Sequence, residues 1–257
     1  MTGRFCMFFM CVSLGLAAPV TWGDDTARLT AYNDGDFQSA YSLAEAEDQS
    51  ADTLAFMARA ILADCIVIGI NPPNEQLKRA ESLAVRALQL DGDHIEARLQ
   101  LAISLSLQAR YMSLSEARKS GYGELSQHLA KEVLEADPDN VWAHGFLSVW
   151  NVEVRRVGGM IGARIMGASV DKAEDHFKAA AATDPANLTV KWQYARALAA
   201  LNTERYQAAI LLVLRDIAGR EPGDAVERSL HVRAAALAEM IEDDRLSDAE
   251  NAARSWL

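Results

Sequence analysis

Histidine is the residue type most able to bind a metal or to move a proton in this chain, and the spacing of its five copies argues against both roles. A helical zinc site usually shows a second histidine or a cysteine four positions away, and none of them has one. Acids at that spacing pair His128 with Glu132 and His231 with Glu227, and a single such pair does not indicate a metal site. We expect solvated or interhelical histidines, without a bound metal, at His94, His128, His144, His176 and His231.

Other residue types that could support catalysis also lack a useful arrangement. Asp171, Glu174 and Asp175 fall in the first turns of an expected helix, where acids complement the helix dipole. Paired-carboxylate catalysis is the remote alternative for these acids. The glycines of 158–162 have neither the preceding strand nor the spacing of a phosphate-binding loop. Since no Ser/His/Asp or Cys/His arrangement can be argued, we expect a protein that is not an enzyme and uses no cofactor.

The charge balance narrows the class of partner. The 257 residues include 36 acidic and 25 basic side chains, which gives a formal charge of −11. A nucleic-acid backbone or an anionic membrane requires a basic face on the protein, so neither is expected as the main partner. We therefore expect no nucleic acid and favour a protein or peptide segment.

The N-terminus has the layout of a secretory signal peptide. Arg4 precedes an uncharged and mostly apolar stretch over 5–18, and the small residue Gly23 precedes two acids. An uncleaved transmembrane helix would need about twenty apolar residues, and this run is shorter. We expect 1–23 to be removed on export to the periplasm, which leaves 24–257 as a single helical repeat domain.

A recurring pair of small residues indicates the elements that must position any binding surface. A small residue followed four positions later by a small or apolar one occurs six times, and the first members are separated by 40, 46, 47, 36 and 40 residues. This period indicates a solenoid of helical hairpins, each of which buries its apolar face against its neighbours. The pairs are Ala40/Ala44, Ala80/Ala84, Ser126/Ala130, Ala173/Phe177, Ala209/Val213 and Ala249/Ala253. The apolar periodicity and the breaks predict helices over 24–33, 36–47, 51–68, 75–90 and 94–108.

Three of these units superpose on an aspartate that precedes the next helix. Asp91, Asp137 and Asp184 each follow a small residue eleven positions earlier and Ala or Val four positions earlier. Small residues recur where the two helices of a hairpin approach closely. With a proline after two of the aspartates, the pattern resembles the tetratricopeptide repeat. The resemblance spans 24–257, is strongest over 75–201, and implies an all-α solenoid of tetratricopeptide-like hairpins.

The C-terminal units fit the pattern less well. The segment 221–224 breaks the chain at the expected place, but the helix after it is out of register. Ser247 and Glu250 predict a capping box at the start of a terminal helix. The apolar Trp256 and Leu257 are expected either to cap the array or to dock elsewhere.

Two units exceed the usual repeat by about a dozen residues, and we place the surplus between the helices of a hairpin, at 111–123 and 155–169. The second insert is unusual for a loop because it has four glycines, three arginines and no acid. Repeat arrays place insertions on one edge, often the binding edge. The candidate contact residues of this insert are Arg155, Arg156, Met160, Ile161, Arg164 and Met166.

The two inserts make the resemblance more specific. Residues 120–123 lead into a helix that ends in the Asp-Pro segment 136–144, and Trp150 and Glu153 lead into the second insert. Together these segments look like the regulator of microtubule dynamics family and its exported bacterial relatives. That resemblance implies organelle-associated adaptor proteins among the eukaryotic members and, in at least one branch, a lipid-binding repeat domain.

In a repeat array of this kind, the first helix of each hairpin lines the concave groove. The groove positions of the family map here onto a set that is more apolar than a groove for charged peptide tails, and it could hold an apolar helix, an extended peptide or an acyl chain. The alternative is a bent array that closes on itself and buries these residues as core. The positions are Glu96, Leu99, Ile103, Leu107, Trp142, Val149, Val152, Glu153, Thr189, Trp192 and Arg196.

Two functions remain open on these grounds. The first is a non-enzymatic periplasmic scaffold or adaptor that binds a protein segment in the concave groove. The second is a carrier of a lipid or another apolar ligand in the same groove, with the insert 155–169 as a lid or as a peripheral membrane contact.

Overall fold

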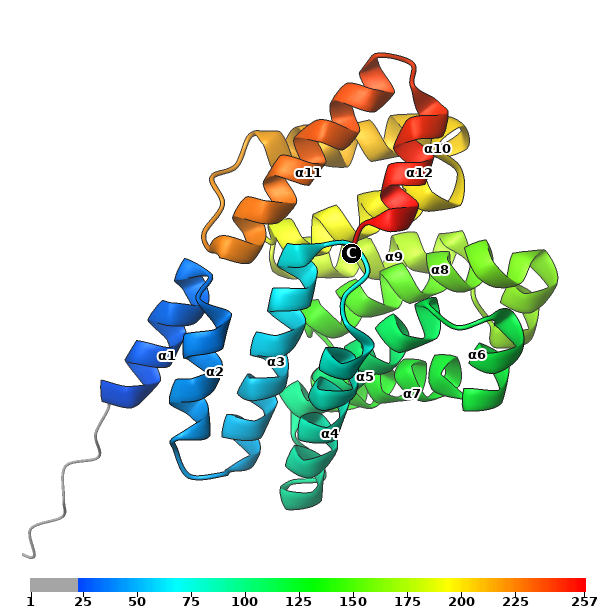
Figure 1. The fold of residues 1–257 in the computed structure, drawn as a ribbon. Helices are drawn as coiled ribbons and strands as arrows, with labels where there is room; N and C mark the ends of the chain where they lie inside the picture. Colours follow the sequence, from blue (N-terminus) through cyan, green and yellow to red (C-terminus); the bar gives the residue numbers. More distant parts are fainter. Residues whose placement is uncertain (1–22) are drawn as a thin grey trace, which may run out of the picture.

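The computed structural model describes residues 23–257, and the predicted signal peptide lies outside these residues apart from Gly23. Every regular element of this part of the chain is a helix, which confirms the all-α solenoid (Figure 1). No helix within 23–257 has both the length and the apolarity that crossing a membrane requires. The helices are α1 Gly23–Asp34, α2 Phe37–Glu45, α3 Ala51–Ile68, α4 Asn74–Leu90, α5 Ile95–Arg110, α6 Leu114–Ser120, α7 Tyr122–Ala136, α8 Val141–Met166, α9 Val170–Thr183, α10 Leu188–Ala218, α11 Ala225–Glu242 and α12 Leu246–Ser255.

The helices form six consecutive hairpins, which are α1/α2, α3/α4, α5/α7, α8/α9, the two halves of α10, and α11/α12. The five helices predicted between residues 24 and 108 are confirmed, with ends that agree to within two residues. The break inside α10 is Asn202, whose backbone is extended (φ −170°, ψ 99°). Its side chain accepts the N–H of Arg205 at 2.8 Å and so starts the second half of the helix.

The three superposed aspartates end their helices in the same way. The backbone N–H of each donates to the carbonyl four residues earlier, at 2.8–2.9 Å. Three positions after each aspartate, a side chain accepts an N–H of the next helix and so caps it. These capping atoms are His94 Nδ1, Asn140 Oδ1 and Asn187 Oδ1.

Five of the six small-residue positions lie where helices cross. Ala40, Ala80, Ser126, Ala173 and Ala249 are fully buried. In the fifth pair Ala209 is exposed, and the second half of α10 instead buries the stripe Ile210, Val213, Leu214 and Ile217. The pair Ala209/Val213 is therefore out of register as a marker of close helix packing.

The insert 155–169 is helical for most of its length, which corrects its reading as a loop. α8 continues through it to Met166 with one interruption at Gly159 (φ 63°, ψ −162°). This backbone conformation is essentially restricted to glycine, so the glycine that suggested a loop instead marks a sharp break between two helical pieces. The other insert contains the short helix α6, which begins with a capping box formed by Ser113 and Glu116.

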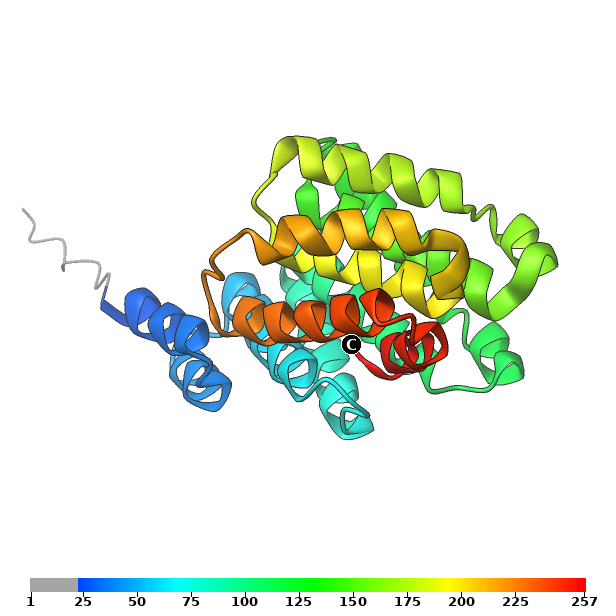
Figure 2. The ribbon, with the colours of Figure 1, turned by 90° about the horizontal axis from the view of Figure 1, so that it is seen from above.

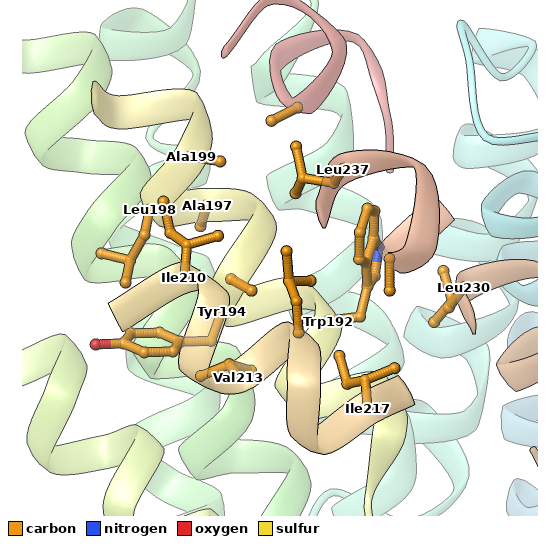
Figure 3. Packing of buried hydrophobic residues seen from close by; sticks show 14 of the residues in the cluster. Trp192, Tyr194, Ala197, Leu198, Ala199, Ile210, Val213, Ile217, Leu230 and Leu237 are labelled. Atoms are coloured by element: carbon orange, nitrogen blue, oxygen red, sulfur yellow. The ribbon is translucent and has the colours of Figure 1, made fainter. Parts of the chain in front are cut away.

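The array closes on itself at its C-terminal end. α11 returns toward the N-terminal hairpins and contacts α3 and α1 (Figures 1 and 2). Trp192 of α10 belongs to the same buried cluster as Leu230 and Leu237 of α11 and points toward them (Figure 3). The predicted capping box of the last helix is wrong, because no side chain caps α12 and Glu250 accepts the N–H of Thr203 instead, at 3.3 Å.

Candidate functional site

The last four described residues lie against the C-terminal ends of α3 and α5 and against α10 and α11. After α12 the chain is extended at Trp256 (φ −76°, ψ 152°), and the N–H of Leu257 donates to the carbonyl of Gly69 at 2.9 Å. We call residues 254–257 the tail. Five residues from four helices hold the tail and the end of α12, and we call them the tail seat: Gly69, Arg110, Trp192, Arg196 and Arg233.

Two arginines of the tail seat reach the tail from different hairpins, α5/α7 and α11/α12. Arg110, in the last turn of α5, donates to the backbone oxygen of Trp256 at 2.8 Å and also to that of Arg254. Arg233 of α11 donates to the backbone oxygen of Leu257 at 3.3 Å. The same guanidinium donates to the carbonyls of residues 66 and 67 at 2.7 and 2.6 Å, at the C-terminus of α3, where the helix dipole favours a cation.

The first half of α10 supplies the other two donors. The indole N–H of Trp192 lies 3.3 Å from the backbone oxygen of Leu257, and its ring is 5.8 Å from the ring of Trp256. Arg196 donates to the carbonyl of Ala253 at 3.3 Å. All of these donors contact backbone oxygens of residues 253–257, so the end of the chain is held through its main chain, while the Trp192 ring contacts the ring of Trp256.

Gly69 is the position where the tail comes closest to α3. It ends α3 in the left-handed conformation, with φ +80°. A Cβ placed there would lie 2.2 Å from Nη2 of Arg233. The absence of a side chain therefore allows both the helix end and the approach of the guanidinium.

Behind the tail seat, one acid balances several arginines. Glu153 of α8 accepts from Arg196 at 3.1 Å and from Arg156 at 2.7 Å. Burial opposes ionisation of Glu153, but these guanidiniums and that of Arg110 outweigh it and lower its pKa to about 2. Burial and the neighbouring Arg196 lower the pKa of Arg110 to about 10, which leaves it charged near neutral pH.

The predicted groove residues divide between the interior and the surface. Val152, Glu153, Trp192 and Arg196 come together behind the tail, with Val149 packed beside them. Leu99 is buried with Val133 and Ala143, away from the tail, while Ile103 and Leu107 pack against the N-terminal core. The remaining three are Glu96, which lies 3.3 Å from Arg59, half-buried Thr189, and Trp142, which exposes 50% of its surface.

The predicted insert residues also divide. Arg156 is engaged with Glu153, and Met166 packs against the cluster of Trp150, Ala163 and Ala168. The other four lie at or near the surface, with Arg155 half-buried and Met160, Ile161 and Arg164 exposed.

Sequence reasoning did not identify Gly69, Arg110 or Arg233 as binding residues. The groove positions carried over from the family lie on the first helices of three central hairpins. Arg110 is on one of these helices, three residues after Leu107, but was not one of the positions, and Gly69 and Arg233 lie on other hairpins. Gly69 had a signal, since it ends an apolar helix, but the signal indicated only a helix end. Arg110 continues the spacing of Ile103 and Leu107 along α5, which could have suggested it. Arg233 had no signal, because its role depends on how the last hairpin returns to the array.

A second polar group lies between α8 and α9. Nδ1 of His144 is 2.9 Å from Nδ1 of His176, and Nε2 of His144 is 3.0 Å from the carbonyl of Pro138. Since that carbonyl only accepts, Nε2 carries the proton of neutral His144 and His176 donates to its Nδ1. Burial, followed by His144, lowers the pKa of His176.

His176 lines a pocket of about 350 Å³, together with residues that include Lys131, Asn151 and Lys172. No group of three or more His, Cys, Asp or Glu side chains that could hold a metal occurs among the residues described. The sequence predicted solvated or interhelical histidines, and this pair is interhelical.

No family model matches the chain, and no curated protein matches it by sequence. Its fold is similar to that of TTC0263, a thermophilic tetratricopeptide repeat protein in Thermus thermophilus, with 19% identity and a TM-score of 0.57 over 83% of this chain and 96% of that one. A human IFIT1 dimer with m7Gppp-AAAA is more distant, with 15% identity and a TM-score of 0.47 over 87% of this chain and 56% of that one.

These similarities concern the fold, and the narrower resemblance to the regulator of microtubule dynamics family stays a prediction. The element order, the six hairpins and the first of the two solved structures agree with the repeat pattern. The chain therefore has the fold of a tetratricopeptide-type helical repeat protein.

Proposed function

We propose that this protein is a non-enzymatic scaffold or adaptor that binds an extended segment of a partner protein in the tail seat. Repeat arrays of this type use their concave surface for binding. One observation carries the proposal. The end of the chain already lies in the seat, helical through Ser255 and extended at Trp256, and Arg110, Trp192 and Arg233 donate to its backbone oxygens.

The chemistry of the tail seat favours a peptide over a lipid. The guanidinium and indole donors are directed at the backbone oxygens of Ala253, Arg254, Trp256 and Leu257, which are acceptors that a polypeptide supplies. An acyl chain offers these donors no acceptor, so burying it among them would leave polar groups unpaired. The apolar-ligand alternative is tested by lipid extraction and mass spectrometry of the purified protein, and a stoichiometric copurifying lipid would favour it.

The tail also acts as a competitor for its own site. A partner segment can bind only when the tail leaves, so its apparent affinity is reduced by the fraction of molecules with an open seat. Weakening the tail should therefore raise the affinity for a peptide supplied in solution.

The test uses a labelled peptide with the sequence of residues 252–257. We expect the variant Trp256→Ala/Leu257→Ala to bind it and the wild type to bind it at least tenfold more weakly (about 1.4 kcal/mol). Adding Arg233→Ala to this variant should remove the binding, whereas adding Leu212→Ala, an exposed side chain outside the seat, should not. Circular dichroism verifies that the variants keep their helical content. Equal peptide binding by the wild type and the released variant would contradict the proposal.

Export to the periplasm is part of the proposed function. The basis is the charge and apolar pattern of residues 1–23. N-terminal sequencing of the protein from a periplasmic fraction should give a chain that begins at Asp24. A chain that retains Met1 in the cytoplasmic fraction would contradict export.

A further inference from the structure

The end of α8 carries the three most exposed large apolar side chains of the described residues. Ile161 is 77% exposed, and Met160 and Ile165 are each 74% exposed. We call residues 155–166 the tip. Three aliphatic side chains within six residues form a local apolar patch on the surface, and such patches mark places where a protein contacts another body.

The tip is held in place by packing on its inner side. Ala163 is 3% exposed and belongs to the cluster that contains Trp150, with Met166 packed against it. The indole N–H of Trp150 donates to the carbonyl of Gly123 at 3.0 Å, which ties the cluster to the start of α7. The short helical piece after Gly159 therefore presents its apolar side chains outward by its fold, and not as part of an unstructured loop.

The same end of the molecule concentrates positive charge. The two inserts, 111–123 and 155–169, contain five basic residues and one acid, in a chain whose formal charge is −11. The acid is Glu116, which is engaged in the capping box of α6. Figures 1 and 2 place α6, with its exposed Arg118 and Lys119, at the same end of the array as the tip.

Within the tip, Arg164 is exposed and Arg155 is half-buried, while Arg156 is engaged with Glu153. The nearest acid after the tip is Asp171, in the first turn of α9. The exposed aliphatic side chains are therefore flanked by cations rather than by acids.

We propose that the tip binds the surface of a membrane that contains anionic lipids. Met160, Ile161 and Ile165 enter the boundary between headgroups and acyl chains, and Arg155 and Arg164 contact the lipid phosphates. Charge complementarity selects this occupant. A protruding apolar patch suits a lipid surface, whereas a peptide would need a groove, and bases of a nucleic acid would need aromatic rings to stack on.

Vesicle flotation tests the proposal. We expect the wild type to float with vesicles of phosphatidylethanolamine and phosphatidylglycerol, and much less with vesicles of phosphatidylcholine. The variant Met160→Ser/Ile161→Ser/Ile165→Ser should lose at least about tenfold in bound fraction, since three interfacial apolar side chains are removed. The matched control is Leu212→Ser/Val232→Ser, at side chains that are 72 and 70% exposed elsewhere, and it should bind as the wild type does.

Two further measurements identify the contributions. Arg164→Glu should weaken binding in part, and raising the salt concentration should weaken it in the wild type. The released variant Trp256→Ala/Leu257→Ala should float as the wild type does, because the tail seat is a different site. The proposal is wrong if the wild type does not bind phosphatidylglycerol vesicles, or if the control loses as much as the tip variant. It is also wrong if the tip variant loses only a protein partner in a pull-down.

Discussion

The tail seat and the tip use similar residue types in opposite ways. In the tail seat, buried Trp192 and Arg196 and half-buried Arg110 and Arg233 donate to the backbone of the protein's own C-terminal end. At the tip, Arg155 and Arg164 lie near the apolar side chains of Met160, Ile161 and Ile165 in the sequence. These three side chains are 74–77% exposed. The difference shows that the return of the last hairpin gives the donors of the tail seat partners within the chain. The tip has no such cover and is the accessible surface.

The largest expected effect tests whether the inner face is core. Trp192→Ala should lower the free energy of unfolding by about 3–5 kcal/mol, because it removes a fully buried ring and leaves a cavity. Trp142→Ala, at a position predicted for the same groove but half exposed, should cost below about 1 kcal/mol. Denaturant unfolding measures both, and equal losses would contradict the closed inner face.

The next effect concerns the acid behind the tail seat. Glu153→Gln should lower the free energy of unfolding by about 2–3 kcal/mol, because buried guanidiniums lose their counter-charge.

The pH dependence of stability is a second test of Glu153. Its pKa of about 2 lies below the ordinary 4.5, so the unfolded chain binds the proton first and the stability from Glu153 is lost as the pH falls from 4.5 toward 2. Thermal unfolding across this range should show a shallower acid loss in Glu153→Gln. The control is Glu174→Gln, at an exposed acid that pairs with Lys178, and it should keep the wild-type profile.

A smaller effect distinguishes close packing from backbone strain. Gly69→Ala should cost about 2 kcal/mol, since it adds a clash with Arg233 to the strain of a positive φ. Gly121→Ala has a similar φ of +68° and open space around it, and should cost about 1 kcal/mol. If the two substitutions cost the same, the guanidinium of Arg233 moves freely and the tail seat is loosely packed.

The smallest effect tests the histidine pair between α8 and α9. Because the pKa of His176 is lowered in the folded protein, the unfolded chain takes up a proton first as the pH falls below 6.5, and stability decreases. His176→Gln should remove part of the decrease in melting temperature between neutral and mildly acidic pH. Gln127→Ala, at the same pocket, serves as the control and should retain the wild-type decrease.

The sequence predicted the helices and the register of the central hairpins because small residues and capping residues act locally. The aspartate loops before His94, Asn140 and Asn187 are examples, since each helix end and the next cap lie within three residues. The register of the second half of α10 was predicted wrongly. A single extended residue, Asn202, replaces the usual turn there and changes which side chains face inward.

The candidate site was less predictable because it depends on distant contacts. Glu153, Trp192 and Arg196 were proposed from their repeat positions and do lie together. Gly69 and Arg233, which complete the tail seat, are far apart in the sequence, and no local pattern relates one to the other. The direction in which the last hairpin folds back decides whether such residues line an open groove or contact the tail.

The return of α11 to the N-terminal hairpins has a consequence for folding. In an open repeat array each unit contacts only its neighbours, so the ends fray independently and unfolding is a one-dimensional process. Here Arg228 donates to the carbonyl of Asn33, 195 residues away, and Arg233 donates to that of Ile66. These contacts turn the linear array into a ring, so its first and last units should exchange amide hydrogens together, and the closing step should be late and slow.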